Sequence, residues 1–346
     1  MPGFLMIVPM GDASQHRNMW LDDGEHRCFD ILAMYFGSDD KFECPECVAV
    51  FRAKDAKWHL LHLLAVSQLW QDIKGRYSVF MVPDDDLLMS THVINTAFQA
   101  FLHFNLQLGQ PAVCQHRDST TMQRLMLREP GSGLRYTAFV EIMAPMFSAK
   151  VMDELIMPNL NDSYTGYGLD SAWPRMLGFP KDRVGVIDAV CMFHPAYQAP
   201  NRRRVYNNPH PRGWSTWDEE RETMRRFGVT WAARHAAGIK DKQELHVWSS
   251  IPEAQFWAEF QTKQCKGGNN PMPSSIREVA ASSTSQTSAM AAQGMLAIQV
   301  LIDIAALWLA LRRWAGPGWQ ATVSLAGKAA VLRPGWTGWK KLATEE

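Results

Sequence analysis

The sequence lacks an excess of charge of either sign, because 35 lysine and arginine residues balance 35 aspartate and glutamate residues among its 346. A neutral total argues against nucleic acid as a partner, since proteins that bind it usually present a basic surface. Cysteine is sparse: six residues are spread over the chain, without the density of a small secreted disulfide framework. We therefore predict a protein of a reducing compartment, the cytoplasm, that does not bind nucleic acid.

The N-terminus lacks a basic leader, and its apolar residues 4–8 are too few for the core of a signal peptide. We predict a first buried strand there. Cys44 and Cys47 have the spacing of half a zinc site, but no second cysteine pair follows at a distance that would complete four ligands. Structural zinc is therefore not expected.

Apolar runs alternate with helix-like stretches, and a hydrophobic content of 47% is enough for a large core. This alternation predicts an α/β fold with a mostly parallel central sheet flanked by helices. We expect strands at 4–8, 29–36, 78–82, 135–143 and 184–192, and helices at 58–73, from Ser90 to about 105, at 148–157 and from about 216 to 227. Ser90 is the expected cap of the second of these helices, and residues 214–218 resemble a capping box that opens the last one.

The last third differs in composition, because a Gly, Asn and Pro break at 267–271 and a Ser- and Thr-rich stretch precede the apolar segment 289–311. Asp303 costs about 3 kcal/mol at a bilayer centre, which makes a membrane span marginal at best. We expect instead a helix that packs on the protein, on a second copy as a homo-oligomer, or flat on a membrane surface as a peripheral contact. The predicted organisation is a first domain at 1–235, a helical extension and linker at 236–280, and a hydrophobic helical appendage at 281–346.

Three consecutive acids, Asp84, Asp85 and Asp86, follow the predicted strand 78–82 directly. Open α/β sheets bind ligands at the carboxyl ends of their strands. Adjacent carboxylates repel one another unless a positive charge lies among them, and a divalent metal often supplies it. The other interpretation is a solvated acidic turn before a helix.

Further short motifs occur in a fixed order around these acids, over about residues 4–230. They are Val8-Pro9-Met10-Gly11-Asp12 with Ser14 and His16, Phe29-Asp30 with Tyr35-Phe36-Gly37, Val82-Pro83-Asp84-Asp85-Asp86, 139–148 (FVEIMAPMFS), Gly166-Tyr167-Gly168-Leu169-Asp170, and Val184-Gly185-Val186-Ile187-Asp188 leading to His194. In these motifs the chain resembles glycosyltransferases of the GT-A type, and more closely a plant and bacterial family of uncharacterised domains with a similar acidic motif.

The resemblance implies a GT-A-like fold that binds a nucleotide-sugar donor, by family habit a UDP-sugar, with Mn²⁺ or Mg²⁺ bridging the diphosphate. Asp84 and Asp86 match the two acids of the Asp-any-Asp motif, with Asp85 between them, and His194 matches a later histidine that completes the metal shell. A lone histidine after a strand is as often a structural hydrogen-bonding residue. The transferase would move the sugar to a hydroxyl of a glycan or another acceptor.

Other candidates follow from their chemistry and position. Lys57, Arg135, Arg202, Arg203 and Arg204 carry groups that match phosphate oxygens. Asp12 and Asp39 come just after the first two strands, where base and ribose would lie; each is alternatively an ordinary turn residue.

Asp170 follows two glycines and opens a helix-like stretch, where it would remove the proton from the acceptor hydroxyl. It is alternatively an N-cap. A single base of this kind favours inversion of the sugar's configuration, although the family also contains retaining enzymes.

Two further function classes stay open. Phosphohydrolases and nucleotidyltransferases also bind metals on acids that follow strands, and a binding module would hold a nucleotide or glycan without turnover. A phosphohydrolase with an aspartyl nucleophile would carry its acids after the first strand, whereas here they follow the third. The position favours the transferase.

Overall fold

The computed structural model describes residues 3–12, 14–119, 121, 123–195, 210–239, 246–263, 265, 323–325 and 328–330. The chain separates into two compact units, Met1–Thr284 and Ser285–Glu346. In the second unit, β10 (Val323–Leu325) and β11 (Lys328–Ala330) form an antiparallel hairpin. No helix among the described residues is long and apolar enough to cross a membrane, and the apolar segment 289–311 lies outside them.

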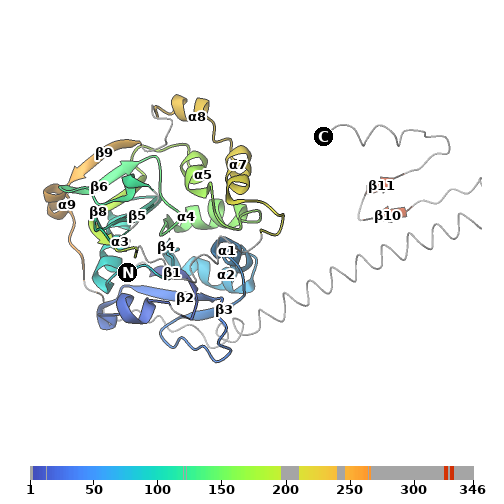
Figure 1. The fold of residues 1–346 in the computed structure, drawn as a ribbon, viewed down its shortest axis with the longest axis horizontal. Helices are drawn as coiled ribbons and strands as arrows, with labels where there is room; N and C mark the ends of the chain where they lie inside the picture. Colours follow the sequence, from blue (N-terminus) through green and yellow to red (C-terminus); the bar gives the residue numbers. More distant parts are fainter. Residues whose placement is uncertain are drawn as a thin grey trace, which may run out of the picture. The chain divides into compact units, whose positions relative to one another are not determined.

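A nine-stranded sheet forms the centre of the first unit, in the order β3-β2-β1-β4-β7-β5-β8-β6-β9 (Figure 1). The strands are β1 (Gly3–Met10), β2 (Phe29–Tyr35), β3 (Ala49–Arg52), β4 (Tyr77–Met81), β5 (Leu108–Val113), β6 (Ser132–Thr137), β7 (Met146–Ser148), β8 (Val184–Met192) and β9 (Val247–Pro252).

The pairing within this sheet is mixed. The pairs β1–β2, β1–β4, β2–β3 and β5–β8 are parallel, and the pairs β4–β7, β5–β7, β6–β8 and β6–β9 are antiparallel. The predicted α/β class with a central sheet and flanking helices is confirmed, but the sheet is not mostly parallel. Strands β5, β6 and β7 follow one another with no α-helix between them, and parallel neighbours require such a crossover.

Helices cover both faces of the sheet and produce three layers (Figure 1). The helices are α1 (Lys57–Ala65), α2 (Gln68–Ile73), α3 (Thr91–His103), α4 (Ala149–Val151), α5 (Leu169–Met176), α7 (Thr216–Arg226), α8 (Trp231–Ala236) and α9 (Glu253–Glu259). Alternate residues of β1 point to opposite faces, as a strand's period of two requires. Met6 packs in a core with α3 and α9, whereas Ile7 packs in a core with α1, α2 and α5.

Helix ends follow local capping chemistry. Ser90 caps α3 as predicted, with its Oγ accepting from the Val93 N–H at 3.3 Å, and Ser215 and Asp218 form the expected capping box of α7. The predicted single helix at 58–73 is wrong: α1 ends at Ala65, and Ser67 caps a second helix, α2. A serine that can bond to the backbone offers the chain an alternative to continuing the helix.

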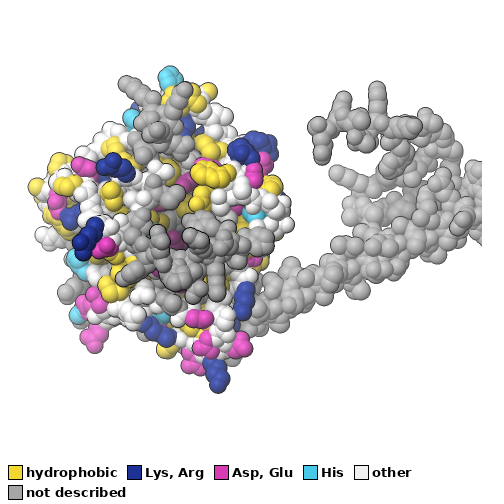
Figure 2. All heavy atoms as spheres, in the orientation of Figure 1, with side chains coloured by type: hydrophobic (Ala, Val, Ile, Leu, Met, Phe, Trp, Pro, Cys, Tyr) yellow, Lys and Arg dark blue, Asp and Glu magenta, His cyan; other side chains and the backbone are white. Residues whose placement is uncertain are grey.

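The sheet continues past residue 235, where we placed a domain boundary. Strand β9 pairs with β6 at the edge of the sheet, and Phe256 of the following helix α9 is fully buried in the core. On the face shown in Figure 2, basic and acidic side chains of the described residues are interspersed rather than gathered in one field of a single sign.

The cysteines are paired, although we predicted a protein of a reducing compartment. Disulfides join Cys28 to Cys265, Cys44 to Cys47 and Cys114 to Cys191. Separations of 237 and 77 residues hid two of these pairs, because only the fold brings such distant residues together. Disulfides persist mainly in oxidising compartments, so the reason we gave for a cytoplasmic location no longer holds.

Candidate active site

The acidic motif lies at the carboxyl end of β4, next to the segment that leads into β7. Val82 donates its N–H to the Pro145 carbonyl and Asp84 donates its N–H to the Met143 carbonyl, each at 2.9 Å. These two bonds fix the backbone that leads into the acids. The three carboxylates therefore leave a rigid edge of the sheet, as predicted from the strand that precedes them.

Lys57, the first residue of α1, neutralises the first acid. Its Nζ donates to Asp84 Oδ1 at 2.8 Å and to the carbonyls of Ile142 and Met143 at 2.8 and 3.2 Å. Burial lowers the pKa of Lys57, and the neighbouring carboxylates oppose this shift. Burial also raises the pKa of Asp84, which Lys57 opposes, although 39% of the Asp84 side chain reaches solvent. The structure thus brings together two residues that we had singled out separately.

Asp85 turns towards the end of β1. Its Oδ2 accepts the Gly11 N–H at 2.9 Å, and its carbonyl accepts the Gln15 N–H at 2.9 Å. Burial, together with repulsion from its two acidic neighbours, raises the pKa of Asp85 to about 6, and the Gly11 hydrogen bond opposes this rise. Asp85 therefore holds the segment after β1 against the acidic motif.

Asp86 faces His194, which comes from the end of β8. A pair of backbone hydrogen bonds between Leu88 and Phe193, at 2.8 and 3.0 Å, joins the segments that follow β4 and β8. This bridge brings His194 Nε2 to 3.9 Å from Asp86 Oδ1. The predicted proximity of an acid and a histidine 108 positions apart in the numbering is thus present.

The donor set of these residues fits a divalent cation. Carboxylate oxygens and an imidazole nitrogen are ligands that suit Mn²⁺ and, for the oxygens, Mg²⁺. The side chains of Asp86 and His194 are 38% and 19% exposed, although the Asp86 Oδ1 that faces His194 is itself buried. Among the described residues, the more compact group of metal-ligating side chains is a different one, His16, Cys44 and Glu46, whose ligand atoms lie within 4.8 Å of one another.

Asp12 and Asp39 form one hydrogen-bonded turn at the ends of β1 and β2. Asp12 accepts hydrogen bonds from the Tyr35 hydroxyl and from the Ser38 N–H, and these bonds lower the pKa of Asp12. Asp39 donates its N–H to the same Tyr35 hydroxyl at 2.8 Å, and its Oδ1 accepts the Lys41 N–H. A Cβ on Gly37 would lie 2.1 Å from Asp12 Oδ1, so this turn requires glycine.

Arg135 is not available to a diphosphate, which corrects our expectation. It lies on β6, is buried, and forms a bidentate ion pair with Asp188 of β8 at 2.7 and 2.9 Å, while also donating to the Leu127 carbonyl. Removing one partner of such a pair leaves an uncompensated buried charge. Arg202, Arg203 and Arg204 lie outside the described residues.

Asp170 lies in the first turn of α5, but it is not the N-cap. Gly168, at a φ of 87°, takes that position, and Asp170 Oδ1 accepts the Ser171 N–H at 2.8 Å. The loop before α5 packs on the helix that carries Lys57: a Cβ on Gly166 would lie 2.1 Å from the Trp58 ring. Asp170 as the base that acts on the acceptor stays a prediction.

Glu219 of α7 shapes this loop and was not found from the sequence. It is 1% exposed, and its carboxylate accepts the N–H groups of Tyr164, Thr165 and Gly166. In the sequence it is one of several charged residues of a helix, and nothing in that pattern distinguishes it.

Gly11 was part of a motif identified in the sequence, but its role as a hydrogen-bond donor to Asp85 depends on the fold.

Comparison with known proteins shows the family. The family model described as "Protein of unknown function (DUF707)" matches residues 43–241, more than half of the chain, and the chain belongs to this family. No protein of curated function matches the sequence.

The fold is similar to parts of several solved structures. S. aureus TarS is 9% identical, with a TM-score of 0.40 over 59% of this chain and 38% of that one. A TarS fragment in complex with UDP-GlcNAc is 9% identical, with a TM-score of 0.42 over 66% of each chain. GalNAc-T7 with UDP, GalNAc and Mn²⁺ is 11% identical, with a TM-score of 0.47 over 67% of this chain and 49% of that one. The chain thus spans between 38% and 66% of the length of these solved chains.

Proposed function

We propose that this protein is a metal-dependent glycosyltransferase that moves a sugar from a nucleotide-diphosphate donor, a UDP-sugar, to a hydroxyl of a glycan or another acceptor. The observation that supports this most is the acidic motif at the carboxyl end of β4, with Asp86 facing His194 across the Leu88–Phe193 bridge. That edge of an open α/β sheet is where nucleotide ligands bind.

In this proposal, Asp86 and His194 hold Mn²⁺ or Mg²⁺, and Asp84 is their neighbour on the donor side. The ion, when bound, stabilises the negative charge of the diphosphate leaving group. Lys57 holds Asp84 in place by its 2.8 Å ion pair and adds a fixed positive charge beside the acids. Asp85 keeps the segment after β1 in position through Gly11. Asp12 and Asp39 lie on that side of the sheet and are the candidates for ribose and base.

The transfer step assigns Asp170 to the acceptor. The acceptor oxygen forms a bond to the anomeric carbon, the bond from that carbon to the phosphate oxygen breaks, and the acceptor proton moves to Asp170. The nucleoside diphosphate leaves with the bonding electrons. A single base opposite the leaving group corresponds to inversion. Arg202, Arg203 and Arg204 are proposed as further contacts of the diphosphate.

The cellular setting proposed here is an oxidising one, because three disulfides are formed. The apolar C-terminal segment is proposed to contact a second copy or a membrane surface, and it is not needed for donor binding.

The test is donor binding and turnover with the full-length protein. Thermal melting with UDP, UDP-sugars and other nucleotides, each with Mn²⁺ and with a chelator, should show a rise for uridine diphosphates that depends on Mn²⁺, since a ligand of the native state stabilises it. Release of UDP from a UDP-sugar then establishes turnover. Asp72→Asn, which changes a half-buried acid on α2 that accepts a hydrogen bond from Gln68, is the matched control and should behave as wild type.

Two outcomes separate this proposal from its alternatives. Mn²⁺-dependent binding without release of UDP, even with a broad panel of acceptor sugars, indicates a binding module. Release of inorganic phosphate from nucleotides, with no preference for nucleotide sugars, indicates a phosphohydrolase.

A further inference from the structure

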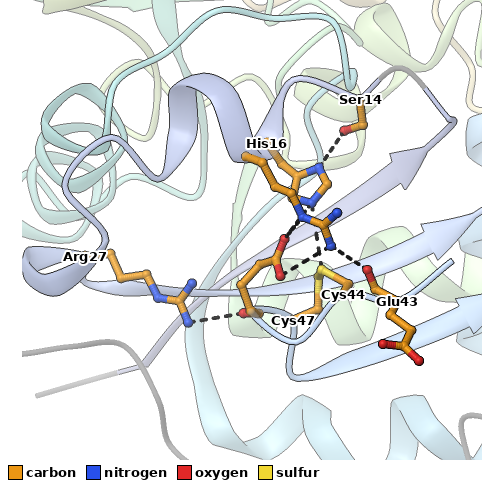
Figure 3. The surroundings of a disulfide bond; sticks show 8 residues. Ser14, His16, Arg27, Glu43, Cys44 and Cys47 are labelled. Carbon is orange, nitrogen blue, oxygen red and sulfur yellow. Dashed lines mark hydrogen bonds and ion pairs between the residues drawn. A yellow bond between two sulfur atoms is a disulfide. The ribbon is translucent and has the colours of Figure 1, made fainter.

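The segment that follows β1 brings His16 to the Cys44–Cys47 pair. His16 is 3% exposed, and its Nε2 lies 3.9 Å from Cys44 Sγ and 3.0 Å from Glu46 Oε1 (Figure 3). In Figure 3 the imidazole lies between Ser14 and Cys44, and its Nδ1 is 3.1 Å from the Ser14 hydroxyl. A ring held through its second nitrogen has a fixed orientation, as metal-binding histidines do.

These distances suit one tetrahedral ion. Zinc bonds of about 2.0 to 2.3 Å to nitrogen, oxygen and sulfur place the ligand atoms roughly 3.3 to 3.8 Å apart. The measured separations of 3.0 and 3.9 Å lie close to that range. Cys47 is the second cysteine of a Cys-x-x-Cys sequence, the spacing common in structural zinc sites. Glu46 lies between the two cysteines in the sequence, and the fold adds His16 from a distant segment.

The loop that carries the two cysteines is held by contacts other than the disulfide. Arg27 donates to the Glu46 carbonyl at 3.1 Å, and Cys47 donates its N–H to the Cys44 carbonyl at 3.0 Å. Opening the disulfide therefore leaves the loop in place. Arg17 pairs with Glu46, but 51% of its side chain is exposed, so it can move away from an arriving cation.

We propose that His16, Cys44, Cys47 and Glu46 form a Zn²⁺ site that exists when the Cys44–Cys47 disulfide is reduced. A dithiol reductant gives two electrons and two protons to the disulfide and is itself oxidised to a disulfide; the S–S bond breaks and two thiols form. Zinc then binds the two sulfurs as thiolates and releases two protons. The site is separate from the acidic motif and does not depend on the proposed transferase activity.

Cobalt is the probe for this site, because Co²⁺ bound to thiolates absorbs strongly in the near ultraviolet and Co²⁺ bound to carboxylates does not. The full-length protein is treated with a dithiol, freed of it without air, and titrated with Co²⁺ and then Zn²⁺. We expect a thiolate band that saturates at one Co²⁺ per chain and is abolished by Zn²⁺. The oxidised protein should give no such band. Absence of the band after reduction would overturn the proposal.

Variants assign the ligands. Cys44→Ser/Cys47→Ser should abolish the band, whereas the matched pairs Cys28→Ser/Cys265→Ser and Cys114→Ser/Cys191→Ser should retain it. Asp86→Asn should also retain it, which distinguishes this site from the one proposed for the donor. A band that persists without Cys44 and Cys47 would place the metal elsewhere.

His16→Gln removes the imidazole and keeps a polar side chain of similar length. It should weaken Zn²⁺ binding by more than about a hundredfold, since even the loss of a group that only orients a ligand costs 10–100-fold. Glu46→Gln should weaken binding by a smaller factor. Unchanged affinity in His16→Gln, in a variant with the wild-type circular dichroism spectrum, would exclude His16 from the site.

Discussion

The acidic motif and the His16–Cys44–Glu46 cluster lie on either side of one short segment, residues 11–16, and they differ in how they are built. Gly11 and Gln15 bond to Asp85, whereas Ser14 and His16 bond within the cluster. The three acids are consecutive in the chain and partly reach solvent. In the cluster, His16 lies 28 and 30 positions from Cys44 and Glu46 in the chain, and His16 and Cys44 are buried.

That difference decides what each region is suited to. Half-buried carboxylates at the edge of a sheet, with a nearby lysine, can exchange an ion and a charged ligand with solvent. A buried imidazole beside a cysteine pair suits a tightly held ion. Changes on the two sides of the segment should therefore have separate consequences, and the following predictions test that separation.

The largest effect is expected at the acceptor side of the acidic region. Asp170→Asn keeps the size of the side chain and its acceptor oxygen for Ser171, but it removes the base. The rate of sugar transfer should fall by roughly 10²–10⁴, as is typical when a general base is lost. Nucleotide affinity, measured by calorimetry, should change little. Equal losses of rate and affinity would make Asp170 a structural residue.

The second-largest effect is expected on the metal-dependent binding of the nucleotide. Asp86→Asn should weaken Mn²⁺-dependent binding of UDP by more than about a hundredfold, because it removes a charged ligand facing His194. Asp84→Asn should also weaken it, and in addition leaves Lys57 without its ionic partner. Calorimetry with and without Mn²⁺ measures both. A full Mn²⁺-dependent melting shift in Asp86→Asn would remove the acid from the metal site.

Two of the disulfides should differ in how much each contributes to the free energy of unfolding. Cys28 and Cys265 close a loop of 237 residues, whereas Cys44 and Cys47 are three apart. Because cross-linking restricts the unfolded chain more when the loop is longer, Cys28→Ser/Cys265→Ser should cost about 3–5 kcal/mol of unfolding free energy and Cys44→Ser/Cys47→Ser about 1–2 kcal/mol. Denaturant unfolding of both variants tests this order. The reverse order of the two losses would mean that the Cys44–Cys47 disulfide stabilises the native structure beyond the closure of its own short loop.

The smallest effect concerns Asp85 and pH. Its pKa of about 6 in the folded protein exceeds the ordinary value of 3.8, so the folded state binds the proton more tightly than the unfolded chain. The fold should therefore become less stable as the pH rises from about 4 to about 6. Asp85→Asn keeps an acceptor for the Gly11 N–H and should reduce this fall by roughly 2 kcal/mol after allowance for solvent screening. An unchanged pH profile of denaturant unfolding would contradict the shift.

Much of the fold was predictable because its signals are local. A run of apolar residues with acids behind it predicted β4 and the position of Asp84, and serine at a helix start predicted the caps of α3 and α7. The antiparallel strands were missed, because they depend on which segments become neighbours. The break between α1 and α2 was missed although its signal, the Ser67 cap, is local. Arg135 was misassigned for the same reason: an arginine's chemistry is visible in the sequence, but its buried partner Asp188 is not.

The sequence by itself determined the α/β class, the acidic motif and its place after a strand, because each rests on residues that are adjacent or periodic in the chain. Only the tertiary structure decided that His194 faces Asp86, that Lys57 neutralises Asp84, and that His16 meets Cys44 and Glu46. These contacts join residues that are 27 to 108 positions apart in the numbering. The free energy that brings them together comes from burying the two faces of the sheet under their helices.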